Sequence, residues 1–580
     1  MSLNFFGYYS LVLSFVISIV IIFLSIKDLN NSKKKINTQI IITSSLQLFL
    51  ILLSFICLII LFIKSEFSNE LVFNNSHTTK PLFYKISGVW GNHEGSLLLW
   101  LLILSSFKLI FSVKSINKPK NYLILTIFIQ EILIMGFLIF VLRTSNPFNI
   151  LIPSPVEGLG LNPILQDPAL AIHPPILYLG YVGTSIIFSS SLAALLSNFI
   201  SKEWAKNIKG WILFSWASLT LGIMIGSIWA YYELGWGGFW FWDPVENISL
   251  LPWLSLTALL HCVLVLEKRN ELILWTIVLA ITSFILSLSG TFLVRSGILN
   301  SIHTFASDPD RGIFILTFLF ILAIFALTVL FLKLPKIENS TLKLNILSKE
   351  FFIMINNLFM VYFLSVVLIG TIYPIFLEVL SNEKISIGPP FYNKLLIPFL
   401  IPFLLFMGIA TSLKWINSNL FLHKTKLFFN FIFAFILTFF IFLLFGIKNL
   451  LISILVISSI YLLLTTIRDF FSNTIKLSQK FSHFGFSLLI LSIIFNSILS
   501  KEINKNLRVG ETMMTENETV EFNSVSSIKE KNYIKVLGNF EIKNSDNIVT
   551  ILKPELRIYN QPNIITSEAD IKISLFEDKF

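Results

Sequence analysis

Charged side chains are scarce in this sequence. Asp, Glu, Lys and Arg make up 13% of the 580 residues, whereas hydrophobic residues make up 55% and include 58 phenylalanines. A soluble domain could not hide so much apolar surface from water. The composition therefore excludes a soluble enzyme and predicts a polytopic membrane protein.

Cysteine is rarer still, with only Cys57 and Cys262 in the whole chain. Both lie inside apolar segments, far apart in the sequence, and they form no CxxC motif. This pattern predicts no disulfide and argues against thiol redox chemistry by the chain itself.

Apolar runs of about twenty residues, the length that crosses a hydrocarbon layer of roughly 30 Å, recur along the chain. The first of them lacks a basic leader and is too long for a signal-peptide core, so we interpret it as an uncleaved span. The runs predict an all-α polytopic membrane protein with about 14 transmembrane helices, at 5–26, 39–63, 96–113, 122–142, 176–200, 211–231, 248–266, 272–292, 313–332, 351–378, 395–413, 427–446, 449–466 and 481–500.

Lysine and arginine gather in alternate loops between these spans. By the positive-inside rule the basic loops face the cytoplasm, and both chain ends then lie outside. The net charge of +10 is therefore a topology signal, and nucleic acid is not needed to explain it. The basic loops are at 27–38, 114–121, 201–210, 267–271, 333–350, 414–426 and 467–480.

Polar sequence with alternating apolar residues follows Ser500, as in NYIKVLGNF and NIVTILKPELRIY. Such alternation is typical of strands. We therefore expect a transmembrane helical domain over 1–500 and a small extramembrane β-rich domain over 501–580.

The stretch WAYYELGWGGFWFWDPVENISLLPW, from Trp229 to Trp253, falls in one of the outer loops and its flanks. Tryptophan favours the membrane interface, so an aromatic lipid anchor is the simpler interpretation. An anchor, however, needs neither the glycines, which let the backbone approach a flat ligand, nor the polar residues behind the rings. We predict a platform for a large planar ligand, formed by Trp229, Trp236, Gly237, Gly238, Trp240, Trp242, Asp243, Pro244, Glu246 and Asn247.

Four histidines occupy informative places. His173 and His303 fall in outer loops on either side of the tryptophan stretch. Two neutral imidazoles are a usual way to hold haem iron, so this pair is a candidate haem site. The alternative is that they are two unrelated loop histidines. His261 and His483 lie within predicted spans, at depths that differ by about 7 Å. An ionisable group there is a candidate functional site, although bonding to nearby hydroxyls is the alternative.

Several other polar residues are expected to have mainly structural roles. Asp243 and Glu246 are expected to bind N–H groups and to shape the loop. Glu131, in mid-span, is expected to serve either proton or quinol chemistry or simply a buried hydrogen bond. His93 is expected to be structural or substrate-contacting, and His77, in a loop, to be solvated.

Four long motifs occur in order along the chain: WGNHEGSLLLW (90–100), LQDPALAIHPPILYLGY (165–181), the tryptophan stretch, and GTFLVRSGILNSIHTFASDPDRG (290–312). Together with ISIGPPFYN (385–393), they resemble the CcmF family of haem-handling proteins with a tryptophan-rich WWD signature. In that family His173 and His303 match the ligands of the external, substrate haem. His261 and His483 match the ligands of a resident b-type haem. From their chemistry, Arg295 and Arg311 could pair with haem propionates, and the alternative for Arg295 is that it only caps the end of its helix.

The resemblance implies a subunit of the cytochrome c haem lyase, or holocytochrome c synthetase, of the system I pathway. Such an enzyme receives haem from CcmE at the periplasmic face of the bacterial inner membrane and attaches it by thioethers to the CxxCH motif of apocytochrome c. The resident haem b would reduce the substrate iron. CcmH, CcmI and quinol are the other implied partners, and no catalytic acid is evident.

Two alternatives remain from the residues alone: a haem transporter or chaperone without lyase activity, and a quinone-linked b-type electron carrier. A mitochondrial inner membrane is a less favoured location. Family members place one more span after the β-rich domain. This sequence ends at Phe580 without it, which predicts a C-terminus that is truncated or completed by another chain.

Overall fold

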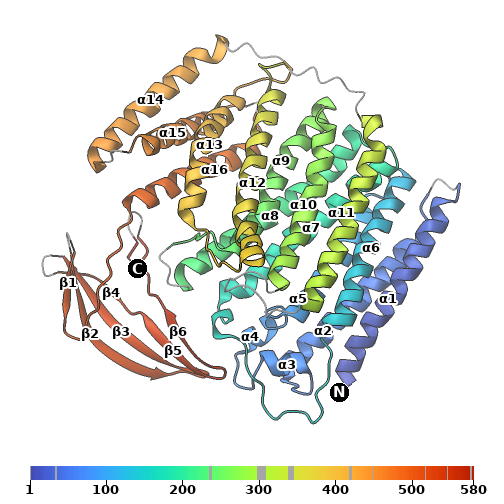
Figure 1. The fold of residues 1–580 in the computed structure, drawn as a ribbon, viewed down its shortest axis with the longest axis horizontal. Helices are drawn as coiled ribbons and strands as arrows, with labels where there is room; N and C mark the ends of the chain where they lie inside the picture. Colours follow the sequence, from blue (N-terminus) through green and yellow to red (C-terminus); the bar gives the residue numbers. More distant parts are fainter. Residues whose placement is uncertain are drawn as a thin grey trace. The chain divides into compact units, whose positions relative to one another are not determined.

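The computed structural model describes the whole chain except residues 1, 33–34, 234–237, 297–308, 338–344, 417–420, 447–448, 474, 516–517, 545–546, 575–577 and 580. Helices dominate, and six strands form a sheet near the C-terminus (Figure 1). The helices are α1 (Ser2–Leu29), α2 (Thr38–Lys64), α3 (Glu70–Asn75), α4 (Leu82–Ser87), α5 (His93–Lys114), α6 (Lys120–Thr144), η1 (Pro163–Leu165), α7 (Pro168–Leu196), α8 (Lys202–Glu233), α9 (Pro244–Arg269), α10 (Ile273–Arg295), α11 (Pro309–Ile337), α12 (Lys349–Ser381), α13 (Pro389–Ala410), α14 (Phe421–Phe445), α15 (Leu450–Phe470) and α16 (Leu477–Leu499).

Within the described part of the chain, 14 helices are long and apolar enough to cross a membrane. They coincide with the spans predicted from the sequence, so the expected fold class is confirmed. The chain forms two compact units. One comprises Met1–Leu256, Ala280–Pro335 and Lys505–Phe580, and the other comprises Thr257–Leu279 and Lys336–Asn504.

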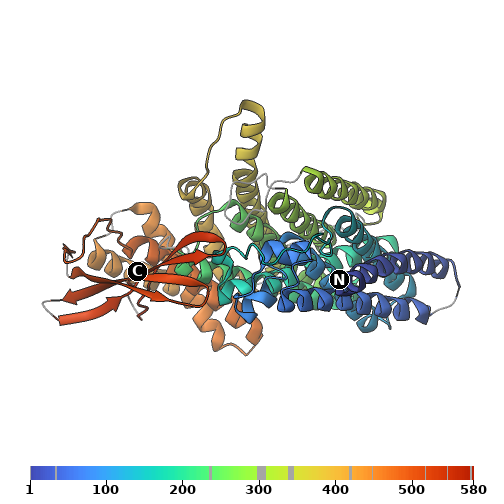
Figure 2. The same ribbon diagram turned by 90° about the horizontal axis from the view of Figure 1, so that it is seen from below.

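An ion pair lies fully buried among the first helices of the chain, of which α1 and α2 pack side by side (the blue helices in Figure 2). Lys108 of α5 is paired with Glu131 of α6, and neither side chain is exposed. Gln47 of α2 donates to Glu131 Oε1 and to Ser18 Oγ of α1, each at 2.7 Å. Glu131 thus has a bonded counterion in the apolar interior, which the sequence did not reveal.

Removing one partner of this pair should be strongly destabilising. Lys108→Met leaves Glu131 as an uncompensated buried charge, at an expected cost of about 3–5 kcal/mol. The double variant Lys108→Met/Glu131→Leu removes both charges and should recover most of that loss. Thermal unfolding of the detergent-solubilised variants measures the effect; equal melting temperatures for the single and double variants would contradict it.

Glycines on both α7 and α8 let these two helices approach closely. A Cβ at Gly180 or Gly183 of α7 would lie 2.5 Å or 2.2 Å from atoms of α8, and a Cβ at Gly222 of α8 would lie 2.8 Å from the α7 backbone. Small residues at such positions are typical of tightly packed membrane helices. The contact fixes the N-terminal half of α7 against α8.

The strands form one antiparallel sheet with the order β1-β2-β3-β5-β6. β4 and β5 share one edge of β3: β5 pairs with residues 533–537 and β4 with residues 540–544. Phe522 and Phe540, opposite one another on β2 and β3, stack with ring centroids 4.3 Å apart. The strands are β1 (Thr512–Met514), β2 (Thr519–Lys529), β3 (Tyr533–Asn544), β4 (Asn547–Leu552), β5 (Glu555–Asn560) and β6 (Asn563–Glu568).

Three hydrogen bonds hold the sheet to the helical part of its unit. Asn532 Nδ2 donates to Gln166 Oε1 at 3.0 Å, and Gln561 Nε2 donates to the carbonyl of Gly158 at 2.8 Å. The Tyr231 hydroxyl donates to Asp578 at 3.1 Å. The sheet is therefore fixed to the segment before α7 and to the end of α8.

Candidate functional site

The tryptophan stretch is shaped by two carboxylates at the start of α9. Glu246 accepts the backbone N–H groups of Phe241 and Asp243, at 3.0 and 3.1 Å. Asp243 in turn accepts the N–H of Val245 at 2.9 Å. This reciprocal arrangement is a capping box, which satisfies donors at the helix N-terminus. Both carboxylates therefore bind backbone N–H groups, as predicted from the sequence.

Trp242 adopts a left-handed backbone conformation, with φ of 58°. This conformation costs a residue with a Cβ about 1–2 kcal/mol. Asn247 stabilises it by donating a hydrogen bond to the Trp242 carbonyl at 3.1 Å. The ring of Trp240 meets that of Trp242 edge-on, with centroids 6.0 Å apart. Such retained strain is typical of functional segments, and it orients two half-buried indoles.

The other predicted platform residues lie in different settings. Trp229 is buried, with 3% of its surface exposed, so its indole packs within the helices rather than facing a ligand. Gly238 and Pro244 lie in the described loop and at the first position of α9. Trp236 and Gly237 lie outside the described residues.

His173 lies inside α7, not in a loop as the sequence suggested. The helix begins at Pro168, because Asp167 caps it by accepting the N–H of Leu170 at 3.0 Å. It then continues through Pro174 and Pro175. Pro175 lacks the N–H that would bond to the Ala171 carbonyl, and Trp90 Nε1 donates to that carbonyl instead, at 2.9 Å. This replacement explains why the prolines do not end the helix.

The His173 ring is oriented by α8. Its Nδ1 donates to the carbonyl of Gly222 at 2.7 Å, which places the lone pair on Nε2, the arrangement that second-shell carbonyls give to metal-binding histidines. A Cβ at Gly226 would lie 2.7 Å from Cε1 of the ring. The Gly222/Gly226 pair has the small-xxx-small spacing of helix contacts, a signal that the sequence analysis did not use.

Gly226→Ala should therefore disturb His173 without removing it. The added methyl cannot fit unless the imidazole moves, so we expect cytochrome c maturation to fall by about tenfold, as for changes in the second shell of a metal site. Covalent haem staining of cytochromes in a complemented deletion strain measures this. Gly210→Ala of the same helix is the matched control, because nothing lies within 4 Å of its Cβ position; equal losses in both variants would contradict the expectation.

His303 lies outside the described residues, so its pairing with His173 stays a prediction. Arg295 is buried and donates to Ser96 Oγ at 2.9 Å and to the His93 carbonyl at 3.0 Å. Arg311 is more exposed and forms a salt bridge with Glu94 at 2.8 Å. His93 is also buried, with Nε2 3.0 Å from Ser145 Oγ, which supports a structural role.

His261 of α9 and His483 of α16 meet within the second unit. Their ring centroids are 6.4 Å apart, and the angle between the ring planes is 26°. The two residues are separated by more than 200 positions in the chain, and similar depth in the membrane and the family resemblance were the indications from the sequence that they could meet. The structure thus brings this predicted pair together.

The distance between the two rings is compatible with an iron bound by both of them. Imidazoles that bind one metal from opposite faces, each through a bond of about 2 Å, place their centroids about 6 Å apart. His261 Nδ1 bonds to the Thr257 carbonyl at 2.8 Å, which leaves Nε2 as its ligating nitrogen. His483 Nδ1 is buried and has no hydrogen-bond partner among the described residues, an unfavourable state unless a ligand changes it.

The expectation that His77 is exposed to solvent was wrong. It lies between α3 and α4 and was expected to be solvated, but only 1% of its surface is exposed. Its Nδ1 lies 3.0 Å from Thr79 Oγ1. Loop position alone was misleading here, because a side chain in a loop can still be packed against its neighbours.

Two protein families match the chain: Cytochrome C assembly protein over residues 90–303, and CcmF C-terminal beta-sandwich over residues 498–580. A cytochrome c-type biogenesis protein of Rhodobacter capsulatus is 38% identical over 92% of this chain and 83% of its own length. The cytochrome c-type biogenesis protein CcmF of Escherichia coli is 36% identical over 91% of this chain and 83% of its own length. A solved structure of Cytochrome c Heme Lyase CcmF superimposes with a TM-score of 0.81, at 22% identity, over 100% of this chain and 91% of that chain.

Proposed function

This chain belongs to the CcmF family of multi-pass membrane proteins of cytochrome c-type biogenesis, and we propose that it is the haem lyase subunit that attaches haem to apocytochrome c. The observation that carries the proposal is the His261–His483 pair. A haem chaperone would need only the outer site beside the tryptophan loop. A second pair of imidazoles inside the helices is expected where electrons must also reach the substrate iron.

The substrate haem would be held at the periplasmic face of the bacterial inner membrane, after delivery by CcmE. His173 and His303 would bind its iron, and the loop with Trp240 and Trp242 would support its plane. The hydrogen bond from His173 to Gly222 would keep Nε2 directed to the metal. Arg311, the more exposed of the two candidate arginines, is the better placed to bind a propionate, whereas Arg295 would hold α5 and α7 around the site.

The attachment chemistry adds each cysteine thiol of the CxxCH motif across one haem vinyl group. A carbon–sulfur bond forms, and the thiol hydrogen goes to the other vinyl carbon, so no atom is lost. The chain contributes orientation of the two reactants and the exclusion of water. CcmH, with CcmI, would supply the thiols in reduced form.

His261 and His483 would hold the resident b-type haem. That group, when bound, supplies electron transfer to keep the substrate iron reduced, with quinol as the proposed donor. Thr257 fixes the tautomer of His261 for this purpose through its carbonyl. A quinone-linked b-type carrier would use the same pair but would leave His173 and the strained loop without a role.

An assay of the purified chain distinguishes a haem lyase from a haem chaperone and from an electron carrier. The chain is incubated with haem-loaded CcmE, reduced CcmH and apocytochrome c, and the products are separated under denaturing conditions and stained for covalent haem. The lyase proposal expects haem that migrates with the cytochrome. Haem released from CcmE without covalent product would indicate a chaperone, and quinol-reducible b haem with neither activity would indicate an electron carrier.

A further inference from the structure

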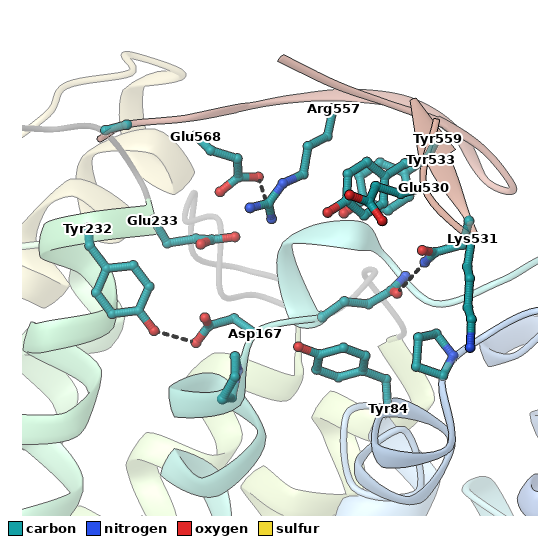
Figure 3. A pocket seen from close by; sticks show the side chains of 15 residues that line it. Tyr84, Asp167, Tyr232, Glu233, Glu530, Lys531, Tyr533, Arg557, Tyr559 and Glu568 are labelled. Carbon is teal, nitrogen blue, oxygen red and sulfur yellow. Dashed lines mark hydrogen bonds and ion pairs between the residues drawn. The ribbon is translucent and has the colours of Figure 1, made fainter. Parts of the chain in front are cut away.

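A cavity lies between the β-sheet and the outer ends of α7 and α8, all within one compact unit (Figure 3). Its volume is about 500 Å³. The helical side contributes Tyr84, Asp167, Tyr232 and Glu233, and the sheet contributes Tyr533, Arg557, Tyr559 and Glu568. None of these residues belongs to the predicted haem sites.

Tyrosines make the walls of this cavity aromatic without adding charge. Burial raises the pKa of Tyr84, Tyr533 and Tyr559, in the last case to about 12, so these phenols stay neutral. Tyr533 and Tyr559 pack together with ring centroids 5.0 Å apart. Neutral aromatic faces of this kind attract cations.

The cavity already holds one cation in this way. The Arg557 guanidinium lies over the Tyr533 ring, 5.4 Å from its centroid, and 3.4 Å from Glu568. Burial lowers the pKa of Arg557, but Glu568 and Glu555 outweigh burial and raise it above its ordinary value. The lining therefore stabilises a guanidinium in a setting largely removed from water.

Two carboxyl groups of the cavity, those of Asp167 and Glu233, form no ion pair within the described part of the chain. Asp167 is 7% exposed and accepts only neutral donors, the Tyr232 hydroxyl at 2.6 Å and the N–H of Leu170. Glu233 is hydrogen-bonded to Glu568, which is 8% exposed. The carboxyl groups of Glu233 and Glu568 therefore lie next to one another in the lining of the cavity. Among the described residues, neither Asp167 nor Glu233 forms an ion pair with a lysine or arginine.

We propose that this cavity binds a basic side chain, lysine or arginine, of the polypeptide that receives haem, between Glu233 and Glu568. The incoming cation lies between the two carboxyl groups, and the tyrosine faces complete its surroundings. An anion, including a haem propionate, would face Asp167 and both glutamates. The choice of polypeptide rests on the proposed function, whereas the preference for a cation rests on the cavity alone.

The position of the cavity suits a docking point for that polypeptide. Asp167 lies six residues before His173 on the same helix, which is about 9 Å along the helix axis. Glu233 ends α8, immediately before the tryptophan stretch. A chain anchored at the cavity would thus present its neighbouring residues to the outer haem site.

The test uses the full-length chain in detergent and two short fluorescent peptides with a CxxCH segment, one flanked by lysines and one with glutamines in their place. We expect the lysine peptide to bind about tenfold more tightly, equivalent to about 1.4 kcal/mol. Glu233→Gln and Glu568→Gln should abolish that preference. Glu530→Gln should keep it, because Glu530, although it lines the cavity, forms an ion pair with Lys535 at 2.9 Å.

The preference should also depend on pH. A carboxyl group binds a cation by charge only when it is ionised, so affinity for the lysine peptide should fall as the pH is lowered into the range in which carboxyl groups become protonated, while lysine itself stays protonated. Affinity for the glutamine peptide should stay constant. The other ionisable groups that line the cavity are Tyr84, Asp167, Tyr232, Glu530, Lys531, Tyr533, Arg557 and Tyr559.

Equal affinities of the unaltered chain for the two peptides would overturn the proposal, and this comparison needs no variant that might fail to fold. A preference that survives in both glutamine variants would also overturn it. Failure of the lyase proposal has a different signature: the lysine peptide is still preferred, but no covalent haem product forms.

Discussion

His261→Ala and His483→Ala should each strip the resident haem from the purified chain. The ring centroids of the two imidazoles are 6.4 Å apart, and the proposed haem iron would be held by both, so removing either would leave it with a single protein ligand. We expect haem occupancy to fall by at least about tenfold, the scale seen when even the supporting shell of a metal site is changed. A reduced pyridine haem spectrum, normalised to protein, measures the occupancy.

The matched control is His77→Ala, which removes a buried histidine outside the membrane spans and should leave the haem in place. The alanine variants must elute as the unaltered chain does in size exclusion, so that loss of haem is not loss of fold. His261→Met or His483→Met should retain some haem with a shifted spectrum, because thioether can ligate haem iron. Full occupancy in both alanine variants would remove these residues as ligands.

His173→Ala should give the opposite result: full resident haem but almost no mature cytochrome c. His173 lies on α7 in the first unit and is oriented by the Gly222 carbonyl, whereas His261 and His483 lie in the second. If His173 binds the iron of the substrate haem as proposed, its loss should lower maturation by about a hundredfold. Covalent haem staining of cytochromes in a complemented deletion strain measures the loss, and the pyridine spectrum of the purified variant measures the retained haem.

This pair of readouts separates the two haem sites within one protein. Trp229→Phe is a useful companion, because that indole is buried among helices, so the smaller ring should lower stability by leaving a cavity but should keep the activity. Normal maturation with His173→Ala would count against the outer site. Simultaneous loss of resident haem and maturation would instead indicate that His173 supports the whole fold.

Most of the architecture was predictable from the sequence because the signals are local. A span needs about twenty apolar residues in a row, and the fourteen predicted runs all correspond to helices. The capping box at Asp243 and Glu246 is also local, since its partners lie within five residues. The error at His173 arose because the predicted apolar span begins only at residue 176, whereas the helix begins at Pro168 and continues past two prolines, where Trp90 satisfies a freed carbonyl.

The sequence by itself therefore determined the membrane class, the spans, the strand-rich end and the residues able to bind haem iron, because each depends on neighbours along the chain. Only the tertiary structure decided which of those residues meet. Depth in a membrane does not specify how a helix is rotated, so the contact between His261 and His483 and the pairing of Lys108 with Glu131 required the folded chain. The same holds for the cavity of Glu233 and Glu568, whose two carboxyl groups come from segments more than 300 residues apart and lie next to one another only because the sheet docks on the helices.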